Sequence, residues 1–413
     1  MAMVVKNNMS ALSTLNTLNK NTNALSKSLK KVSSGMKINS AADDASGYAI
    51  SERMRVQIRS LDQANSNAQN GGSMMKVAEG AVSSTVEILK TLKEKAVNAA
   101  NDTNTDADRQ TIQKELDQSI DQINDNANVT FNGQYLVDGS KNSKTNATCT
   151  ALTNQILSTG TKSTDALTSL KARNGDSLNI QSTDNITVSW VKNGKTYSTA
   201  FQVGDKTLQL VFEAKTGLAT NETISSYIKI SSQSATIVEK DGSGNQVKTA
   251  SGDTALTLLA ANSGVNNQIS GFTISITDNT GAVRKSANAA LDAFDETLRA
   301  QNKSEDNSIN LQIGTKANQT IKVGLTDMKA QALGLQGSDN ATLQVGNQKQ
   351  ANAAINVLDA AIQKALDQQT TIGAVQSRLE YTQSNLTTAS ENVTAAESTI
   401  RDADMAKEMT EYT

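Results

Sequence analysis

Residues 355–400 read INVLDAAIQKALDQQTTIGAVQSRLEYTQSNLTTASENVTAAESTI, and an apolar or small residue recurs there at every seventh position. The repeat consists of Leu358, Ala365, Ile372, Leu379, Leu386, Val393 and Ile400. A seven-residue repeat of this length predicts one long helix that packs along a partner helix. The adjacent register holds Ile355 and Ile362 and then becomes polar, so the apolar stripe is narrow and favours a helical bundle. At about 1.5 Å per residue, such a helix forms a rod too long for a compact domain.

A second helical pattern lies near the start of the chain. Apolar residues there follow alternating steps of three and four, which is the spacing of a helix-packing seam with one polar member. The seam consists of Leu15, Leu18, Thr22, Leu25, Leu29 and Val32. Gly35 interrupts it, and residues 39–44 offer short polar side chains that can cap a new helix. Apolar periodicity then continues over residues 50–61, 77–92 and 112–123, so this part of the chain is predicted to be helical.

The middle of the chain has a different period. Between about residues 138 and 305 the apolar residues alternate, as in strands 186–190 and 197–203 on either side of Asn193-Gly194. An Asn-Gly pair between alternating runs predicts a β-hairpin. Residues 272–276 predict a further strand, and residues 309–313 and 321–325 predict a hairpin that leads into the last helix. The expected fold is therefore a mainly α rod with a β-rich insertion, α+β overall.

The composition excludes several classes of function. The 413 residues include no histidine, which removes catalytic triads that use a histidine base and metal sites that use imidazole. Only one cysteine is present, and 39 basic residues balance 41 acidic ones with 3% aromatics, so neither a disulfide framework nor a nucleic-acid surface is indicated. We find no cleavable signal peptide and no apolar run long enough to span a membrane. We expect no enzyme, no cofactor and no metal site.

Residues 32–50, VSSGMKINSAADDASGYAI, closely resemble the N-terminal signature of bacterial flagellins. The stretches 64–71 (ANSNAQNG), 377–381 (SRLEY) and 400–409 (IRDADMAKEM) are similar to further flagellin sequence. The resemblance covers about residues 1–137 and 306–413, whereas the β-rich middle matches no family that we can name. It implies an inner coiled-coil segment (1–43), two halves of a helical rod (44–137 and 306–399), variable outer domains (138–305) and the start of a C-terminal inner segment (400–413).

The same resemblance implies a function and a set of partners. A flagellin polymerises with copies of itself into the extracellular flagellar filament and serves motility. It leaves the cell through the flagellar type III export apparatus with a chaperone, and it meets hook-associated and cap proteins. The alternative is a hook–filament junction protein, whose ends are similar. A flagellin that carries a zinc protease is excluded, because its His-Glu-x-x-His motif needs histidines that this chain lacks.

One departure from the family pattern concerns the end of the chain. Flagellins normally continue beyond the segment that matches residues 400–409 with another amphipathic helix, whereas this sequence stops at Thr413. We therefore expect a truncated inner segment, which leaves the apolar seam of residues 12–32 without part of its cover.

A second departure concerns recognition by Toll-like receptor 5. Flagellins that activate this receptor carry Leu-Gln-Arg-x-Arg-Glu-Leu-Ala-Val on a rod helix, and residues 89–97 of this chain, LKTLKEKAV, match that stretch. The resemblance implies receptor-facing positions at Leu89, Thr91, Lys93, Glu94, Lys95 and, further along, Glu115. Thr91 and Lys95 replace an arginine and a leucine of the motif, so we expect a weak ligand at most. The same stretch also reads as an ordinary solvated helix face.

Overall fold

The structure is a computed structural model that describes residues 8–213, 223–232, 234–249 and 252–413. The first seven residues of the expected 1–43 segment therefore lie outside the described part. The chain forms two compact units. The first unit contains residues 1–73, 311–321 and 377–413, and the second contains residues 74–310 and 322–376.

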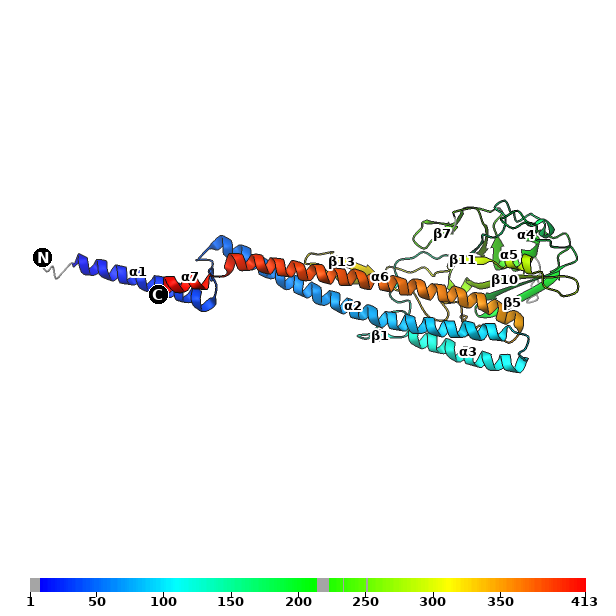
Figure 1. Ribbon diagram of the computed structural model, residues 1–413, viewed down its shortest axis with the longest axis horizontal. Coiled ribbons are helices and arrows are strands. Elements are labelled where there is room, and N and C mark those ends of the chain that lie inside the picture. The colour runs from blue at the N-terminus through cyan, green and yellow to red at the C-terminus, as the bar shows by residue number, and fades with distance from the viewer. Residues whose placement is uncertain (1–7, 214–222, 233, 250–251) are drawn as a thin grey trace. The chain divides into compact units, whose positions relative to one another are not determined.

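The helices lie mainly towards the two ends of the sequence, as the apolar periodicity predicts (Figure 1). They are α1 (Met9–Ser34), α2 (Ala45–Ala99), α3 (Asp106–Ala127), α4 (Leu208–Phe212), α5 (Lys285–Leu291), α6 (Gln348–Arg401) and α7 (Met405–Tyr412). The two apolar stretches expected at residues 50–61 and 77–92 belong to one helix, because α2 continues through Gly71 and Gly72. A Cβ atom at Gly71 would lie 2.6 Å from Leu311 Cδ1, so glycine lets the 309–323 hairpin approach α2 closely.

The strands lie between α3 and α6 in the sequence. They are β1 (Thr130–Phe131), β2 (Gln134–Tyr135), β3 (Ala151–Asn154), β4 (Asn185–Lys192), β5 (Lys195–Gln202), β6 (Ile228–Ile230), β7 (Ile237–Lys240), β8 (Gln246–Lys248), β9 (Leu256–Ala260), β10 (Ile269–Thr277), β11 (Phe294–Leu298), β12 (Ile309–Gln312) and β13 (Thr320–Val323). The expected hairpins are confirmed, since β4 pairs with β5 across Asn193-Gly194 and β12 pairs with β13.

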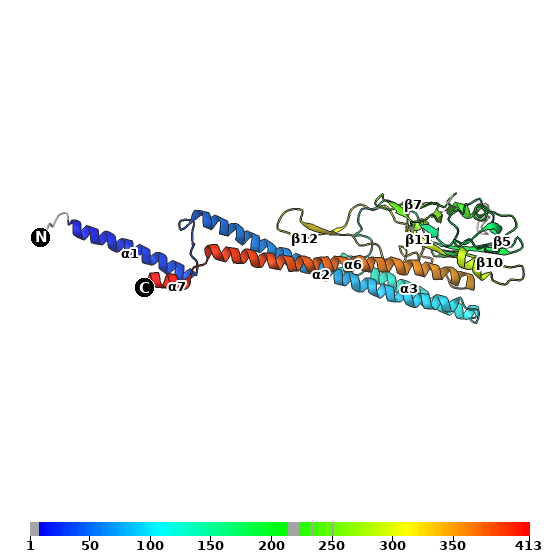
Figure 2. The same ribbon diagram turned by 45° about the horizontal axis from the view of Figure 1, so that its top comes forward.

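The helices α2 and α6 run side by side in opposite directions within each unit (Figure 2). In the first unit, Arg55 of α2 lies 3.6 Å from Glu397 of α6, and Asp62 accepts a hydrogen bond from Ser390. In the second unit, Gln376 of α6 donates to Glu79 of α2 at 2.8 Å. This long packed pair confirms the helical bundle that the heptad repeat predicts.

Local capping sets where the helices begin. The Asp44 carboxylate accepts from the backbone N–H groups of Ser46 and Gly47 at 3.0 Å each, and so caps the start of α2. Thr105 and Asp108 form a reciprocal capping box at the start of α3. The prediction that aspartates cap the start of α2 is therefore confirmed for Asp44, whereas Asp43 accepts from the backbone N–H groups of Asn39 and Ser40 in the preceding turn.

The β-rich part of the second unit has its own core between two antiparallel sheets. One sheet has the order β10-β4-β5 and the other β11-β3-β9-β6. Apolar side chains from both sheets and from α4 and α5 meet in this core, including Trp190, which is fully buried. The core packs against α6 at Gly271, where a Cβ atom would lie 2.7 Å from Val357 Cγ2. Glycine at this bulge of β10 allows that close approach.

Candidate functional site

The most unusual surface of the first unit is the apolar face of α1. The structure buries none of the residues of this helix. Its leucines are between 48% and 60% exposed, and they are Leu12, Leu15, Leu18, Leu25 and Leu29. A contiguous apolar stripe of this kind costs free energy in water and marks a surface that packs against another polypeptide.

The short helix α7 covers one end of this stripe. Lys31 of α1 donates to Glu408 of α7 at 3.0 Å, and the Glu408 side chain is only 10% exposed. Met405 and Met409 of α7 remain partly exposed beside it. The paired helices α1 and α7 therefore present one apolar surface, which we call the α1–α7 surface.

Two connecting segments hold α1 and α7 together. Gly35 ends α1 with a φ of 69°, in the left-handed region that glycine adopts at little cost. Its backbone oxygen accepts from the N–H of Ala403 at 3.0 Å, and the Lys37 N–H donates to the Arg401 oxygen at 2.7 Å. The segment that follows α1 is thus hydrogen-bonded to the segment that precedes α7, although the two segments are far apart in the sequence.

Arg401 anchors this connection. Its side chain is buried, donates to Glu52 at 2.6 Å and lies over the Tyr48 ring, with its guanidinium carbon 5.3 Å from the ring centre. The hydrogen bond from Arg401 lowers the pKa of the Glu52 carboxyl. Sequence reasoning placed residue 400 in the apolar repeat but did not identify Arg401, because a buried arginine gives no periodic signal.

The apolar repeat of α6 changes its burial along the helix. Leu358, Ile372 and Leu379 are fully buried. Leu386, Val393 and Ile400 are only partly buried, so the stripe becomes accessible towards the end of α6. Val77, which the sequence pattern placed on the packed face of α2, is 36% exposed, since Met74, Met75 and Ala78 occupy the buried positions instead.

The receptor-facing candidates lie on α2 and α3 in the second unit. Thr91 and Glu94 are exposed, whereas Lys93 and Lys95 are partly buried. Lys93 forms an ion pair with Asp359, and Lys95 lies 2.9 Å from Glu115. Leu89 needs a correction, because its side chain is fully buried against the bundle and cannot face a receptor. Leu89 packs in the core of the helical bundle, and the sequence motif alone does not distinguish a core position from a receptor-facing one.

Arg109 is a further residue that sequence reasoning missed. It follows the 101–105 loop and is buried, and its Nε donates to the Ala99 oxygen at 2.9 Å. Another of its nitrogens donates to the Asn101 oxygen at 3.0 Å, so it fixes the turn between α2 and α3. The nearby acidic residues Asp102 and Asp106, which form ion pairs with Arg109, were the sequence feature that could have indicated its role.

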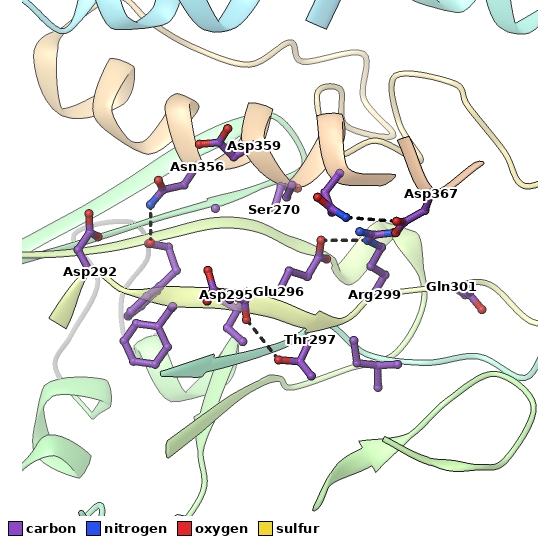
Figure 3. A pocket seen from close by; sticks show the side chains of 17 residues that line it. Ser270, Asp292, Asp295, Glu296, Thr297, Arg299, Gln301, Asn356, Asp359 and Asp367 are labelled. Carbon is purple, nitrogen blue, oxygen red and sulfur yellow. Dashed lines mark hydrogen bonds and ion pairs between the residues drawn. The ribbon is translucent and has the colours of Figure 1, made fainter. Parts of the chain in front are cut away.

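A cleft of about 740 Å³ in the second unit lies between β11 and α6 (Figure 3). Charged side chains line it, and several of them pair with one another. Arg299 lies 3.4 Å from Glu296 and 2.7 Å from Asp367, and Asn356 of α6 donates to the Phe272 oxygen at 3.1 Å. These contacts attach the β-rich part to α6, so the cleft is a polar seam between packed elements.

The described residues contain neither a cluster of three side chains able to hold a metal ion nor a helix apolar enough to cross a membrane.

Comparisons with known proteins agree with the helical ends. A family model described as the bacterial flagellin N-terminal helical region matches residues 5–142, and one described as the C-terminal helical region matches residues 355–413. The chain is 34% identical over 411 residues to a flagellin of Clostridium tyrobutyricum, covering 99% of this chain and 94% of the relative. It is 30% identical over 414 residues to a flagellin of Bacillus subtilis strain 168, covering 100% and 91%.

Among solved structures, the flagellar junction protein FlgL from Legionella pneumophila is 13% identical, with coverage of 85% of this chain and 99% of that chain. The TM-score is 0.34, which is too low to carry an argument.

Proposed function

Because this chain belongs to the bacterial flagellins, a family of structural proteins, we propose that it polymerises with copies of itself into the flagellar filament and serves motility. The observation that carries the proposal is the α1–α7 surface, whose leucines remain about half exposed in the single chain. Burial of such leucines contributes about 1.5–3 kcal/mol each when it is complete. Repeated contacts of this kind can hold a polymer together without any chemical reaction.

The test changes the α1–α7 surface in the organism that makes this chain. Leu18→Asp combined with Leu25→Asp places charges on the apolar stripe, and we expect cells that lack filaments and do not swim. Lys20→Asp, on the same helix outside the stripe, is the matched control and should leave swimming intact. Normal swimming of the double variant would show that assembly does not use this surface.

Further partners follow from the same proposal. The chain would leave the cell through the flagellar type III export apparatus, after release from a chaperone, and would contact hook-associated and cap proteins at the filament ends. Its place would then be the extracellular filament. The alternative, a hook–filament junction protein, predicts that antibody labelling gathers at the base of the filament, whereas a filament subunit is labelled along its whole length.

A second proposed role is weak recognition by Toll-like receptor 5. Thr91 and Glu94 are exposed on one face of α2, and Lys95 lies next to them with its pair Glu115. An arginine at position 91 could form paired hydrogen bonds that a threonine cannot, and an apolar residue at position 95 could be buried in a complex. The chain as it stands lacks both contacts.

Thr91→Arg combined with Lys95→Leu should therefore raise receptor signalling by about tenfold or more, since each anchor contributes about 2 kcal/mol. Lys76→Leu makes a similar change elsewhere on α2 and serves as the control. If the unchanged chain already signals as strongly as a flagellin with the full motif, the weak-ligand proposal fails.

A further inference from the structure

A partly buried lysine, which is not among the residues proposed for assembly or receptor contact, lies at the wall of another cleft. The cleft has a volume of about 300 Å³ and lies in the second unit, beside residues 138–145, 300–304 and 324–332. Lys364 of α6 lines it, and its Nζ donates to the backbone oxygen of Ala332 at 2.6 Å. The amine is thus held in place next to a space that can admit a small molecule.

Charged groups of both signs surround this amine. Asp327 lines the same cleft, and its Oδ1 accepts from the Lys329 N–H at 2.9 Å. Glu296, in the middle of β11, and Arg299, just after its end, act on Lys364 electrostatically. Asp138 and the exposed Lys303 complete the charged lining, and Lys329 lies beside Asp327.

The environment changes the protonation of these groups. Burial lowers the pKa of the Lys364 ammonium to about 8, although Glu296 and Asp327 oppose this fall. Near pH 7.5 about a quarter of such amines are neutral, against about one in a thousand for an ordinary lysine. The lower basicity makes each neutral amine a weaker nucleophile, but this loss is smaller than the increase in the fraction of neutral amine. Burial also raises the pKa of the Asp327 carboxyl, whereas the neighbouring lysines lower it.

We propose that Lys364 is a covalent modification site, at which a small aliphatic aldehyde enters the cleft and forms an imine with the ε-amine. The neutral nitrogen attacks the carbonyl carbon, and a proton moves from nitrogen to oxygen to give a carbinolamine. The hydroxyl group then leaves as water with a proton supplied from Asp327, and the carbon–nitrogen double bond forms as an iminium ion. The nitrogen proton returns to the Asp327 carboxylate to give the imine. One water is released, and no oxidant or reductant is needed. Buried lysines with lowered pKa serve this chemistry in other proteins.

The test treats the intact chain with acetaldehyde and cyanoborohydride, which reduces the imine to a stable ethyl-lysine that peptide mapping detects. Lys303 lines the same cleft with an exposed side chain and is the internal reference. Near pH 7.5 we expect Lys364 to react at least about fivefold faster than Lys303, with a pH midpoint near the lysine pKa. In concentrated guanidinium chloride the two rates should become equal.

A pair of variants separates the site from general reactivity. Lys364→Arg should remove the fast phase of lysine ethylation, measured on lysine peptides because the α-amine, with an ordinary pKa of about 8, also reacts fast. Lys303→Arg should leave this fast phase. Peptide mapping of the parent chain decides the matter even if Lys364→Arg fails to fold. The proposal is overturned if Lys364 reacts no faster than Lys303 in the folded chain, or if the fast phase survives Lys364→Arg.

Discussion

Single residues on α6 differ sharply in what they contribute to the helical bundle. Leu379 is fully buried, whereas Tyr381, two positions further along, is 74% exposed. Leu379→Ala should lower the free energy of unfolding by about 2–5 kcal/mol, through lost burial and the cavity that remains. Tyr381→Ala should have little effect, and Gln376→Ala should cost about 1 kcal/mol for its bond to Glu79. Denaturant unfolding measures all three, and a loss below about 0.5 kcal/mol for Leu379→Ala contradicts its place in the core.

Asp292 gives a prediction that depends on pH. Burial raises the pKa of its carboxyl to about 6, although the Ile274 N–H, which donates to Oδ1 at 3.3 Å, opposes this rise. Because the folded-state pKa exceeds the unfolded one, the folded chain binds the proton more tightly, and stability falls as pH rises from about 4 to 6. Asp292→Asn removes this penalty, while its amide oxygen can still accept from Ile274.

The side chain is partly exposed, so solvent screening limits the expected gain from Asp292→Asn to about 1 kcal/mol above pH 6. Below about pH 4 the variant and the parent should be equally stable, because the parent carboxyl is protonated in both states. Thermal unfolding across this pH range checks the prediction. A variant that is less stable than the parent at neutral pH would show that the charged carboxylate stabilises the fold.

At the scale of elements, local sequence patterns predicted the helices and hairpins, because residues close together in the sequence determine them. The heptad repeat predicted α6, Asn193-Gly194 predicted the β4–β5 hairpin, and Asp44 predicted a helix start. The pairing of β3 with β11 and β9 was not predicted, since strands far apart in the sequence carry no pairing signal. The seam between β11 and α6 was missed for the same reason, because Arg299 and Asp367 each read as ordinary surface residues.

The β-rich insertion offers a test at this scale. The chain enters and leaves it along paired backbone, with Thr145 opposite Ser304 and Thr148 opposite Gln301. Since its ends are close, joining residue 137 to residue 306 should cost little loop entropy. We expect a fusion of 1–137 with 306–413 to give strongly helical circular dichroism and a cooperative thermal transition.

The fusion loses the contacts of Gly271 and Phe272 with α6, so its melting temperature should fall below that of the intact chain. Hydrogen exchange can locate the loss, which within α6 should be confined to the part from Asn356 to Asp367 that contacts the insertion. A mostly unfolded fusion would show that the helical bundle depends on the insertion, and that residues 138–305 are not a separate outer domain.

At the scale of the whole molecule, the account depends on the α1–α7 surface. Helix α7 is short and covers α1 only near Lys31, so the leucines from Leu12 to Leu25 need another cover. In the proposed polymer, neighbouring copies of the chain supply the apolar side chains that cover this stripe. Assembly into a regular polymer should then follow from burial of the combined surface.

Electron microscopy after addition of a kosmotropic salt, which strengthens apolar association, tests this claim most directly. The chain is compared with the Leu18→Asp, Leu25→Asp double variant and with the Lys20→Asp control. We expect long, regular filaments from the parent chain and from the control, and only monomers or short oligomers from the double variant. Long, regular filaments from the double variant, or none from the parent chain, would show that assembly does not depend on the α1–α7 surface.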